Sequence, residues 1–252
     1  MSARDSSRAT IADLVTVVAP TRNEERNIAA FLGSIPPQVP VILADASEDA
    51  TLEIAHRNRP QGMMAFPAGL GISSARQMGA KQANTPWVLF TDADVMFADG
   101  YFQRLQSLII EEEQDVVYGI KLSRGRYRRY YQWMARWQRR LHAIGIPAAS
   151  GSNLLMRRSA LDFVGGFDLA LPCNEDSEIA WRAKRSGLRV RFAPELIVYA
   201  RDHRRLERGV WRKIWHSTAR CMLLYLGILP KTWRRSDWGY WREHEVARRS
   251  AR

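Results

Sequence analysis

The stretch that decides the fold is Val88-Leu89-Phe90-Thr91-Asp92-Ala93-Asp94. Residues 87–90 are apolar and follow Pro86, which together predict a buried β-strand. Asp92 and Asp94 come directly after this strand, so we expect them at the carboxyl edge of a sheet, where open α/β folds bind ligands. Residues two apart in extended backbone point to the same side, and two carboxylates there repel unless a cation lies between them. Such oxygen ligands suit Mg²⁺ or Mn²⁺, so the stretch is a candidate metal site, although a solvated turn could carry the same residues.

Strand–helix units precede this stretch. Buried strands are predicted at residues 14–19, 39–44 and 63–66, each followed by a polar turn and a helix. Asn23 is the expected N-cap of the first helix, residues 24–31. Helices between strands imply parallel strands with right-handed crossovers, so the carboxyl ends of the strands meet at one edge. That edge collects Thr21, Asn23, Asp45, Ser47, Asp92 and Asp94.

Composition limits the class of protein. The 252 residues are 46% hydrophobic, which suffices for one large α/β domain or two small ones. A net charge of +12, from 38 basic and 26 acidic residues, predicts an anionic partner: nucleic acid, an acidic membrane surface or phosphorylated substrates. Cys173 and Cys221 form neither a zinc spacing nor a disulfide framework, so we expect a reducing, cytoplasmic location. Residues 1–13 are polar and do not resemble a signal peptide, and the apolar run 221–229 is shorter than the ~20 residues that span a bilayer.

Residues 124–144 predict an amphipathic helix whose opposite face is rich in arginine. Two interpretations are open: the helix binds the surface of an anionic membrane, or its aromatic stripe packs on the domain while the arginines face solvent. Nucleic acid is a third possible partner, and we do not expect it. The stripe consists of Tyr127, Tyr130, Tyr131, Met134, Trp137, Leu141 and Ile144.

The turn that follows the first predicted strand is not a phosphate-binding loop. Residues 20–23 lack the glycines of the dinucleotide fingerprint, and there is no Walker loop in the sequence. A bound diphosphate must therefore be neutralised by a metal and by basic side chains, for which Arg76 is a candidate. Asp45 could accept a hydrogen bond from a base or a ribose.

Four motifs follow one another at residues 19–25, 45–51, 71–79 and 92–94. Their order and spacing resemble the family 2 glycosyltransferases over residues 14–199. The resemblance implies a GT-A fold, which is an α/β, Rossmann-like three-layer sandwich with a mixed, mainly parallel sheet. It also implies an inverting, metal-dependent transfer of a sugar from a UDP- or GDP-linked donor, UDP first, to a hydroxyl acceptor. The basic aromatic segments make a lipid or a membrane-associated glycan one possible acceptor. The expected location is the cytoplasm, at the inner face of the cell membrane.

The resemblance also suggests limits for the parts of the chain. The expected parts are a polar tail (1–13), a GT-A domain (14–205) with a nucleotide-sugar half (14–122) and an acceptor half (123–205), an aromatic helical segment (206–242) and a polar tail (243–252).

Site residues are implied by the same resemblance. Asp94 would be the main ligand of Mg²⁺ or Mn²⁺, with Asp92 nearer the ribose and His203 as a further ligand. Gly151, Ser152 and Asn153 would lie near the acceptor and the donor sugar. The nucleotide-sugar contacts would be Pro20, Thr21, Asn23, Glu24, Asp45, Ser47, Asp49, Arg76, Asp92 and Ala93.

Acidic residues open the predicted helix that follows Asn174, its expected N-cap. Acids are common in a first helical turn, where they complement the helix dipole. Glycosyl transfer also needs a carboxylate that accepts the proton of the attacking hydroxyl. By resemblance this base is Asp176, with Glu175 as its orienting neighbour.

The C-terminal segment predicts a helix at residues 210–229 that closes the core, followed by Trp233, Trp238, Tyr240 and Trp241 among basic residues, which favours a membrane interface. The Gln-x-x-Arg-Trp motif of processive synthases is absent, so polymerisation is not expected.

Two rival functions remain. A nucleotidyltransferase would need a phosphate-binding loop, and a sugar-nucleotide-binding or scaffold protein would not need the five carboxylates Asp45, Asp92, Asp94, Glu175 and Asp176. The sequence does not determine the oligomeric state.

Overall fold

The computed structural model describes residues 9–69, 71–111, 113–207 and 209–234. The strands are β1 Val15–Thr21, β2 Val41–Asp45, β3 Met63–Pro67, β4 Trp87–Phe90, β5 Val95–Phe97, β6 Val116–Leu122, β7 Leu154–Arg157 and β8 Val190–Ala200. The helices are α2 Ile11–Leu14, α3 Ile28–Gly33, α4 Thr51–Asn58, α5 Ile72–Gln82, α6 Tyr101–Glu111, α7 Arg128–Ala143, α8 Arg158–Phe163, α9 Glu175–Arg185, α10 Arg204–Glu207, α11 Val210–Tyr225 and α12 Lys231–Arg234.

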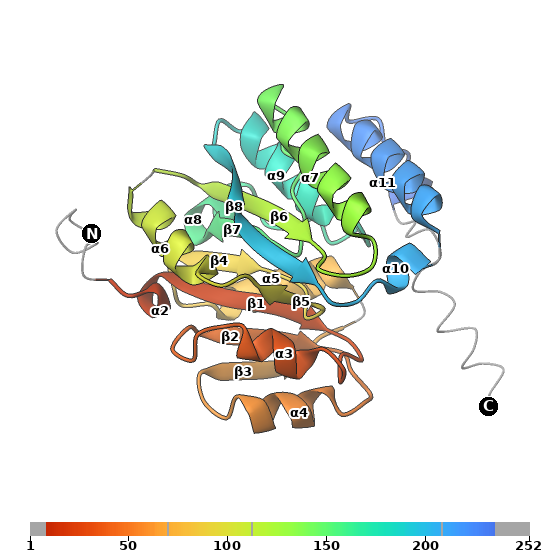
Figure 1. Cartoon of the computed structure of the whole chain (residues 1–252). Coiled ribbons are helices and arrows are strands. Elements are labelled where there is room, and N and C mark those ends of the chain that lie inside the picture. Colours follow the sequence, from red (N-terminus) through yellow and green to blue (C-terminus); the bar gives the residue numbers. More distant parts are fainter. Residues whose placement is uncertain (1–8, 70, 112, 208, 235–252) are drawn as a thin grey trace.

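These strands form one mixed sheet in the order β3-β2-β1-β4-β7-β6-β8-β5 (Figure 1). The predicted parallel arrangement of β3, β2, β1 and β4 is confirmed. β7 runs antiparallel to both β4 and β6, whereas β6 and β8 are parallel and the short β5 pairs antiparallel with β8. The two predicted halves of the domain therefore share one sheet, because β7 and β8 both pair with β6.

Helices cover both faces of the sheet, which makes the predicted three layers. Alternate residues of a strand point to opposite faces. Val17 and Leu89 pack into one buried cluster with residues of α3 and α6. Val18 and Val88 pack into a second cluster with residues of α5, α8 and α9.

Three predictions about local structure need correction. Asn23 does not cap a helix, because α3 begins only at Ile28 and Asn23 has a φ of 56° in the left-handed region. Residues 9–13 are not all tail, because Ile11 lies in α2 and is only 6% exposed. Asn174 does occupy the N-cap position of α9, but its side chain makes no capping hydrogen bond.

The prediction that residues 210–229 close the core is also wrong. Residues 210–225 do form a helix, α11, but Trp211 and Trp215 on it are 82% and 78% exposed. Within the described residues, no helix is both long and apolar enough to cross a membrane. Trp238, Tyr240, Trp241 and the predicted tail 243–252 lie outside the described residues.

Candidate active site

The topology brings the predicted catalytic segments to one edge of the sheet. Phe90 at the end of β4 pairs with Leu154 at the start of β7, because these neighbours are antiparallel. The turn 151–153 therefore lies beside Asp92. The hydroxyl of Ser152 donates a hydrogen bond to Asp92 Oδ2 at 2.5 Å, which joins the two segments directly.

Arg76 is the centre of a buried charge network. Its side chain is 1% exposed, and its Nη2 lies 2.8 Å from Asp92 Oδ1 while Nη1 pairs with the carboxylate of Glu175. The sequence suggested Arg76 as a partner of the donor diphosphate. In the structure its guanidinium holds together two carboxylates, Asp92 from the turn after β4 and Glu175 from the start of α9, and offsets their mutual repulsion.

Two glycines make this position of Arg76 possible. A Cβ atom at Gly79, on the same helix, would overlap Val18 Cγ1, so only glycine lets α5 pack this closely on β1. A Cβ atom at Gly151 would overlap the guanidinium of Arg76. The glycines of the third motif and of the 151–153 turn thus create space for one buried arginine.

The two acids at the start of α9 have different surroundings. Glu175 is buried, whereas Asp176 is partly exposed and accepts hydrogen bonds from the backbone N–H groups of Gly151 at 2.5 Å and Ser177 at 2.6 Å. Burial raises the pKa of both carboxyl groups, and the charge of Arg76 opposes this increase. Asp176 therefore combines partial access, fixed orientation and a raised pKa, which are properties of a general base.

A lysine that the sequence analysis missed completes the group. Lys121 Nζ lies 3.3 Å from Asp94 Oδ1 and donates to the Ser152 hydroxyl at 3.1 Å. Residues 115–122 have the apolar pattern of a strand, and a basic side chain near the end of that strand is the signal that could have identified Lys121. The resulting chain of contacts runs from Asp94 through Lys121, Ser152, Asp92 and Arg76 to Glu175.

His203 lies close to this group. The backbone N–H of Arg201 donates to the carbonyl oxygen of Asp94 at 2.9 Å, which places the loop after β8 beside the Asp-x-Asp turn. The His203 ring packs near the rings of Tyr127 and Tyr131, at centroid distances of 5.4 and 5.8 Å. Burial lowers the pKa of His203, which favours the neutral imidazole that binds metals.

The donor set suits a magnesium or manganese ion that is shared with a substrate. Among the described residues there is no cluster of three or more His, Cys, Asp or Glu side chains placed to hold a metal. Mg²⁺, however, commonly binds one or two carboxylates and takes its other ligands from phosphates and water. Asp94 is partly exposed and already holds a cationic ammonium, so its surroundings fit this kind of site.

The ends of β1 and β2 form a second polar group. Asp45 is 5% exposed and accepts hydrogen bonds from the hydroxyls of Thr21 at 2.6 Å and Ser47 at 2.7 Å. Asn23 joins the same loop, because its N–H donates to Ser47 Oγ at 2.9 Å and its Oδ1 accepts from Glu48 N–H at 2.9 Å. The predicted nucleotide residues Thr21, Asn23, Asp45 and Ser47 thus lie together.

The other residues predicted to contact the nucleotide sugar lie outside this hydrogen-bonded group. Asp49 accepts from the N–H groups of Thr51 at 3.0 Å and Glu25 at 3.3 Å, so it orders the start of α4. Glu24 pairs with Arg204 at 2.5 Å and ties α10 to the loop after β1. Pro20 ends up partly exposed on β1, and Ala93 is buried.

Asn153 has a structural role in the folded chain. It is 1% exposed, its Oδ1 accepts from the Tyr101 hydroxyl at 2.6 Å, and its Nδ2 donates to carbonyl oxygens of Leu196 and Ile120. A sugar could not bind the Asn153 amide without breaking these hydrogen bonds. The side chain therefore fastens the 151–153 turn to the sheet.

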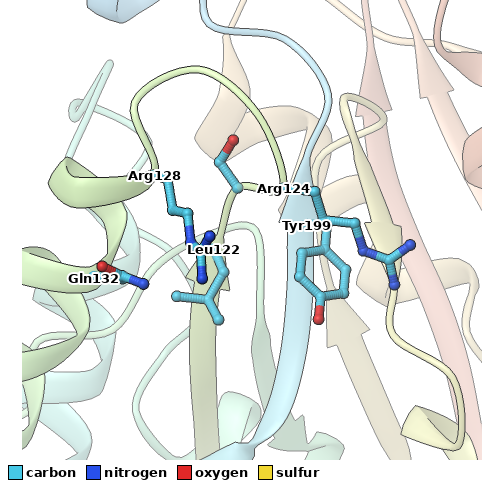
Figure 2. A pocket seen from close by; sticks show the side chains of 6 residues that line it. Leu122, Arg124, Arg128, Gln132 and Tyr199 are labelled. Carbon is cyan, nitrogen blue, oxygen red and sulfur yellow. The ribbon is translucent and has the colours of Figure 1, made fainter.

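A basic hollow of about 330 Å³ lies beyond the ends of β6 and β8 (Figure 2). Leu122 and Tyr199 from these two strands form its floor, and the guanidinium of Arg124 lies 4.2 Å from the centre of the Tyr199 ring. Arg128 and Gln132 of α7 line the other side. Leu122, which lines the hollow, directly follows Lys121 on β6.

Comparison with known proteins identifies the family. Residues 16–165, more than half of the chain, match the model of "Glycosyl transferase family 2". The chain belongs to this family.

The pre-mycofactocin glycosyltransferase of Mycobacterium tuberculosis H37Rv is 27% identical over 218 residues, which cover 81% of this chain and 46% of that protein. The succinoglycan biosynthesis protein ExoA of Rhizobium meliloti is 27% identical over 195 residues, covering 69% of this chain and 59% of that protein. The chain thus spans about half the length of these relatives.

Solved structures confirm the predicted GT-A fold. The mannosyltransferase PcManGT from Pyrobaculum calidifontis, in complex with GDP-Man and Mn²⁺, aligns with a TM-score of 0.66 at 19% identity, over 89% of this chain and 68% of that chain. TarS 1-349 of S. aureus, in complex with UDP-GlcNAc, aligns with a TM-score of 0.61 at 20% identity, over 86% of this chain and 72% of that chain.

Proposed function

We propose that this protein is an inverting glycosyltransferase that moves a sugar from a nucleoside-diphosphate sugar to a hydroxyl acceptor. The observation that carries the proposal is the orientation of Asp176, which two backbone N–H groups hold beside the Arg76 network and the two aspartates of the Asp-x-Asp turn. Family membership supports the same reaction class.

Asp176 accepts the proton of the acceptor hydroxyl as its oxygen attacks the anomeric carbon. The bond between this carbon and the diphosphate oxygen breaks, and the nucleoside diphosphate leaves with the electron pair. Attack from the face opposite the leaving group inverts the anomeric configuration. The raised pKa of Asp176 makes it a stronger base than an exposed aspartate.

Asp94, with Asp92 and His203 nearby, would hold Mg²⁺ or Mn²⁺. Such an ion would neutralise the charge that develops on the leaving diphosphate. Lys121 adds a second positive charge at the same place. The Mn²⁺ in the PcManGT complex supports this assignment.

The donor is assigned to the loops after β1 and β2. Asp45, Thr21, Ser47 and Asn23 form one hydrogen-bonded group there, which suits a base and a ribose. GDP-Man in PcManGT and UDP-GlcNAc in TarS support a UDP- or GDP-linked donor, of which UDP is our first choice.

The acceptor is assigned to the other side of the site. The hollow between Arg124 and Arg128 favours an acceptor that carries negative charge, such as a lipid-linked or membrane-associated glycan. We place this reaction at the inner face of the cell membrane, since Cys173 and Cys221 form no disulfide bond, which is compatible with a reducing cytoplasm.

The test is hydrolysis of a panel of nucleotide sugars, measured as nucleotide release with Mn²⁺ and with EDTA. We expect metal-dependent release from one donor, lost in Asp176→Asn but kept in Asp162→Asn, a matched change at an exposed aspartate of α8. Asp176→Asn should still bind the nucleotide. Nucleotide binding without release or transfer in the wild-type protein would favour a sugar-nucleotide-binding protein instead.

A further inference from the structure

The outer side of α11 presents an apolar stripe. Trp211, Trp215, Met222 and Leu226 are 82%, 78%, 59% and 65% exposed. Their spacing places them within one narrow arc of the helix, since four residues advance about 40° around it beyond a full turn. Large apolar side chains on a helix normally face the core, so a row of exposed ones indicates an interaction surface.

α7 presents a matching stripe. Trp133, Trp137 and Ile144 are 38%, 40% and 71% exposed, and the two tryptophan rings contact each other at a centroid distance of 6.0 Å. Tyr131, on the same helix, is buried instead. The helix therefore anchors itself through one part of its aromatic sequence and exposes another.

The two helices lie side by side (Figure 1). Near their starts, Lys213 Nζ lies 5.4 Å from the centre of the Tyr130 ring. Near their ends, the Tyr225 hydroxyl donates to the carbonyl oxygen of Pro147 at 3.1 Å, just beyond α7. These contacts at both ends make α7 and α11 a parallel pair, and we name their exposed stripes together the α7–α11 surface.

The charge of the α7–α11 surface indicates which kind of partner it binds. Neither helix contains an aspartate or a glutamate. A second copy of the same surface would bring like charges together, and a neutral apolar partner would leave the arginines without a counter-charge. Tryptophan beside arginine matches the headgroup region of an anionic bilayer, where the rings enter the interface and the guanidinium groups meet phosphate. The exposed arginines of α7 are Arg128, Arg129, Arg136, Arg139 and Arg140.

We propose that the α7–α11 surface docks the protein on anionic phospholipid bilayers, which rests on the membrane location proposed above but not on the transfer reaction. The surface connects to the active site through Arg220 of α11, which is 0% exposed and whose Nε donates to Asn174 Oδ1 at 3.3 Å. Asn174 directly precedes Glu175 and Asp176. Docking would thus hold the proposed base at a fixed distance from the bilayer, within reach of a lipid-linked acceptor.

The test is co-sedimentation of the whole chain with vesicles, without donor or acceptor. One set of vesicles contains phosphatidylcholine and phosphatidylglycerol in equal parts, and the other contains phosphatidylcholine alone. We expect binding to the anionic vesicles that weakens in high salt. Trp211→Ser with Trp215→Ser should lower the partition coefficient by about tenfold or more, because two rings no longer leave water.

The matched control is Met64→Ser with Ile110→Ser, which removes exposed apolar side chains from β3 and α6, 49% and 39% exposed. It should bind as the wild type does, and melting temperatures check that each variant folds. Three results would overturn the proposal: no binding to anionic vesicles, binding that the Trp211 and Trp215 changes leave intact, or a dimer that the same changes dissociate. Metal-dependent nucleotide release from the same preparations tests the proposed reaction separately, and the tryptophan variant should retain it.

Discussion

Replacing Arg76 should show how the buried network controls the proposed base. Its guanidinium bridges Asp92 and Glu175, whose side chains are 27% and 4% exposed, while the arginine side chain itself is 1% exposed. Arg76→Met removes the charge and keeps much of the volume. Arg76→Lys keeps the charge, but an ammonium group cannot reproduce the planar, two-sided contact.

The expected loss of stability follows from burial. Removing one partner of a buried ion pair leaves an uncompensated charge and typically costs about 3–5 kcal/mol. Arg76→Met should therefore lower the free energy of unfolding by roughly this amount. The exposed pair of Arg57 with Glu53, 69% exposed on both sides, is the matched control, and Arg57→Met should change stability by less than about 1 kcal/mol.

The pH dependence of activity tests the electrostatic role separately from stability. Burial raises the pKa of Asp176, and the charge of Arg76 opposes this effect. Asp176 accepts a proton only when it is ionised, so activity should fall as the pH drops through its pKa. Without the arginine the pKa rises further, and the acidic limb of the profile should move to higher pH.

The assay is metal-dependent nucleotide release across a pH series, with urea unfolding of the same proteins. Arg76→Lys should lie between the wild type and Arg76→Met in the position of the acidic limb. An unchanged limb in a folded Arg76→Met protein, or a shift to lower pH, would refute the electrostatic link. Equal losses of stability in Arg76→Met and Arg57→Met would refute the burial estimate.

Three further predictions concern neighbouring groups. Gly151→Ala should reduce nucleotide release about a hundredfold, because the added Cβ overlaps the buried guanidinium of Arg76 and moves the proposed base, Asp176. The control is Gly125→Ala, where no atom lies within 4 Å of the added Cβ, and it should match the wild type. Lys121→Met should lower the half-saturating Mn²⁺ concentration up to about fivefold, since the ammonium no longer competes for Asp94; a higher Mn²⁺ requirement would contradict this. Asp45→Asn should weaken nucleotide binding in calorimetry by about tenfold, through the loss of a charged acceptor for hydroxyl groups, and unchanged affinity would exclude Asp45 from the donor site.

Some of the site could be predicted because it depends on local pattern. The apolar run before Asp92 predicts a strand, and helices between strands predict a parallel sheet, so Asp45 and Asp92 had to lie near one edge. The acids at the start of α9 could be found from the order of motifs. The contacts among these residues could not be predicted, because they join side chains that are far apart in the chain.

Arg76 and Lys121 illustrate this limit. Local pattern gives a helix for one and a strand for the other, but not the carboxylates that each contacts. Asn153 illustrates the same limit, since the family resemblance places it near the sugar but does not show that packing commits its amide to the sheet.

The sequence by itself determined the first four strands with helices between them, their parallel pairing and the edge at which Asp45, Asp92 and Asp94 gather, because periodicity and strand ends are properties of short segments. Only the tertiary structure decided which apolar side chains face outward. Helical spacing in α11 shows that its large side chains share a face, but whether that face meets a core depends on what packs against it. Here α11 is held through Arg220 and Tyr225, so the tryptophan face remains exposed.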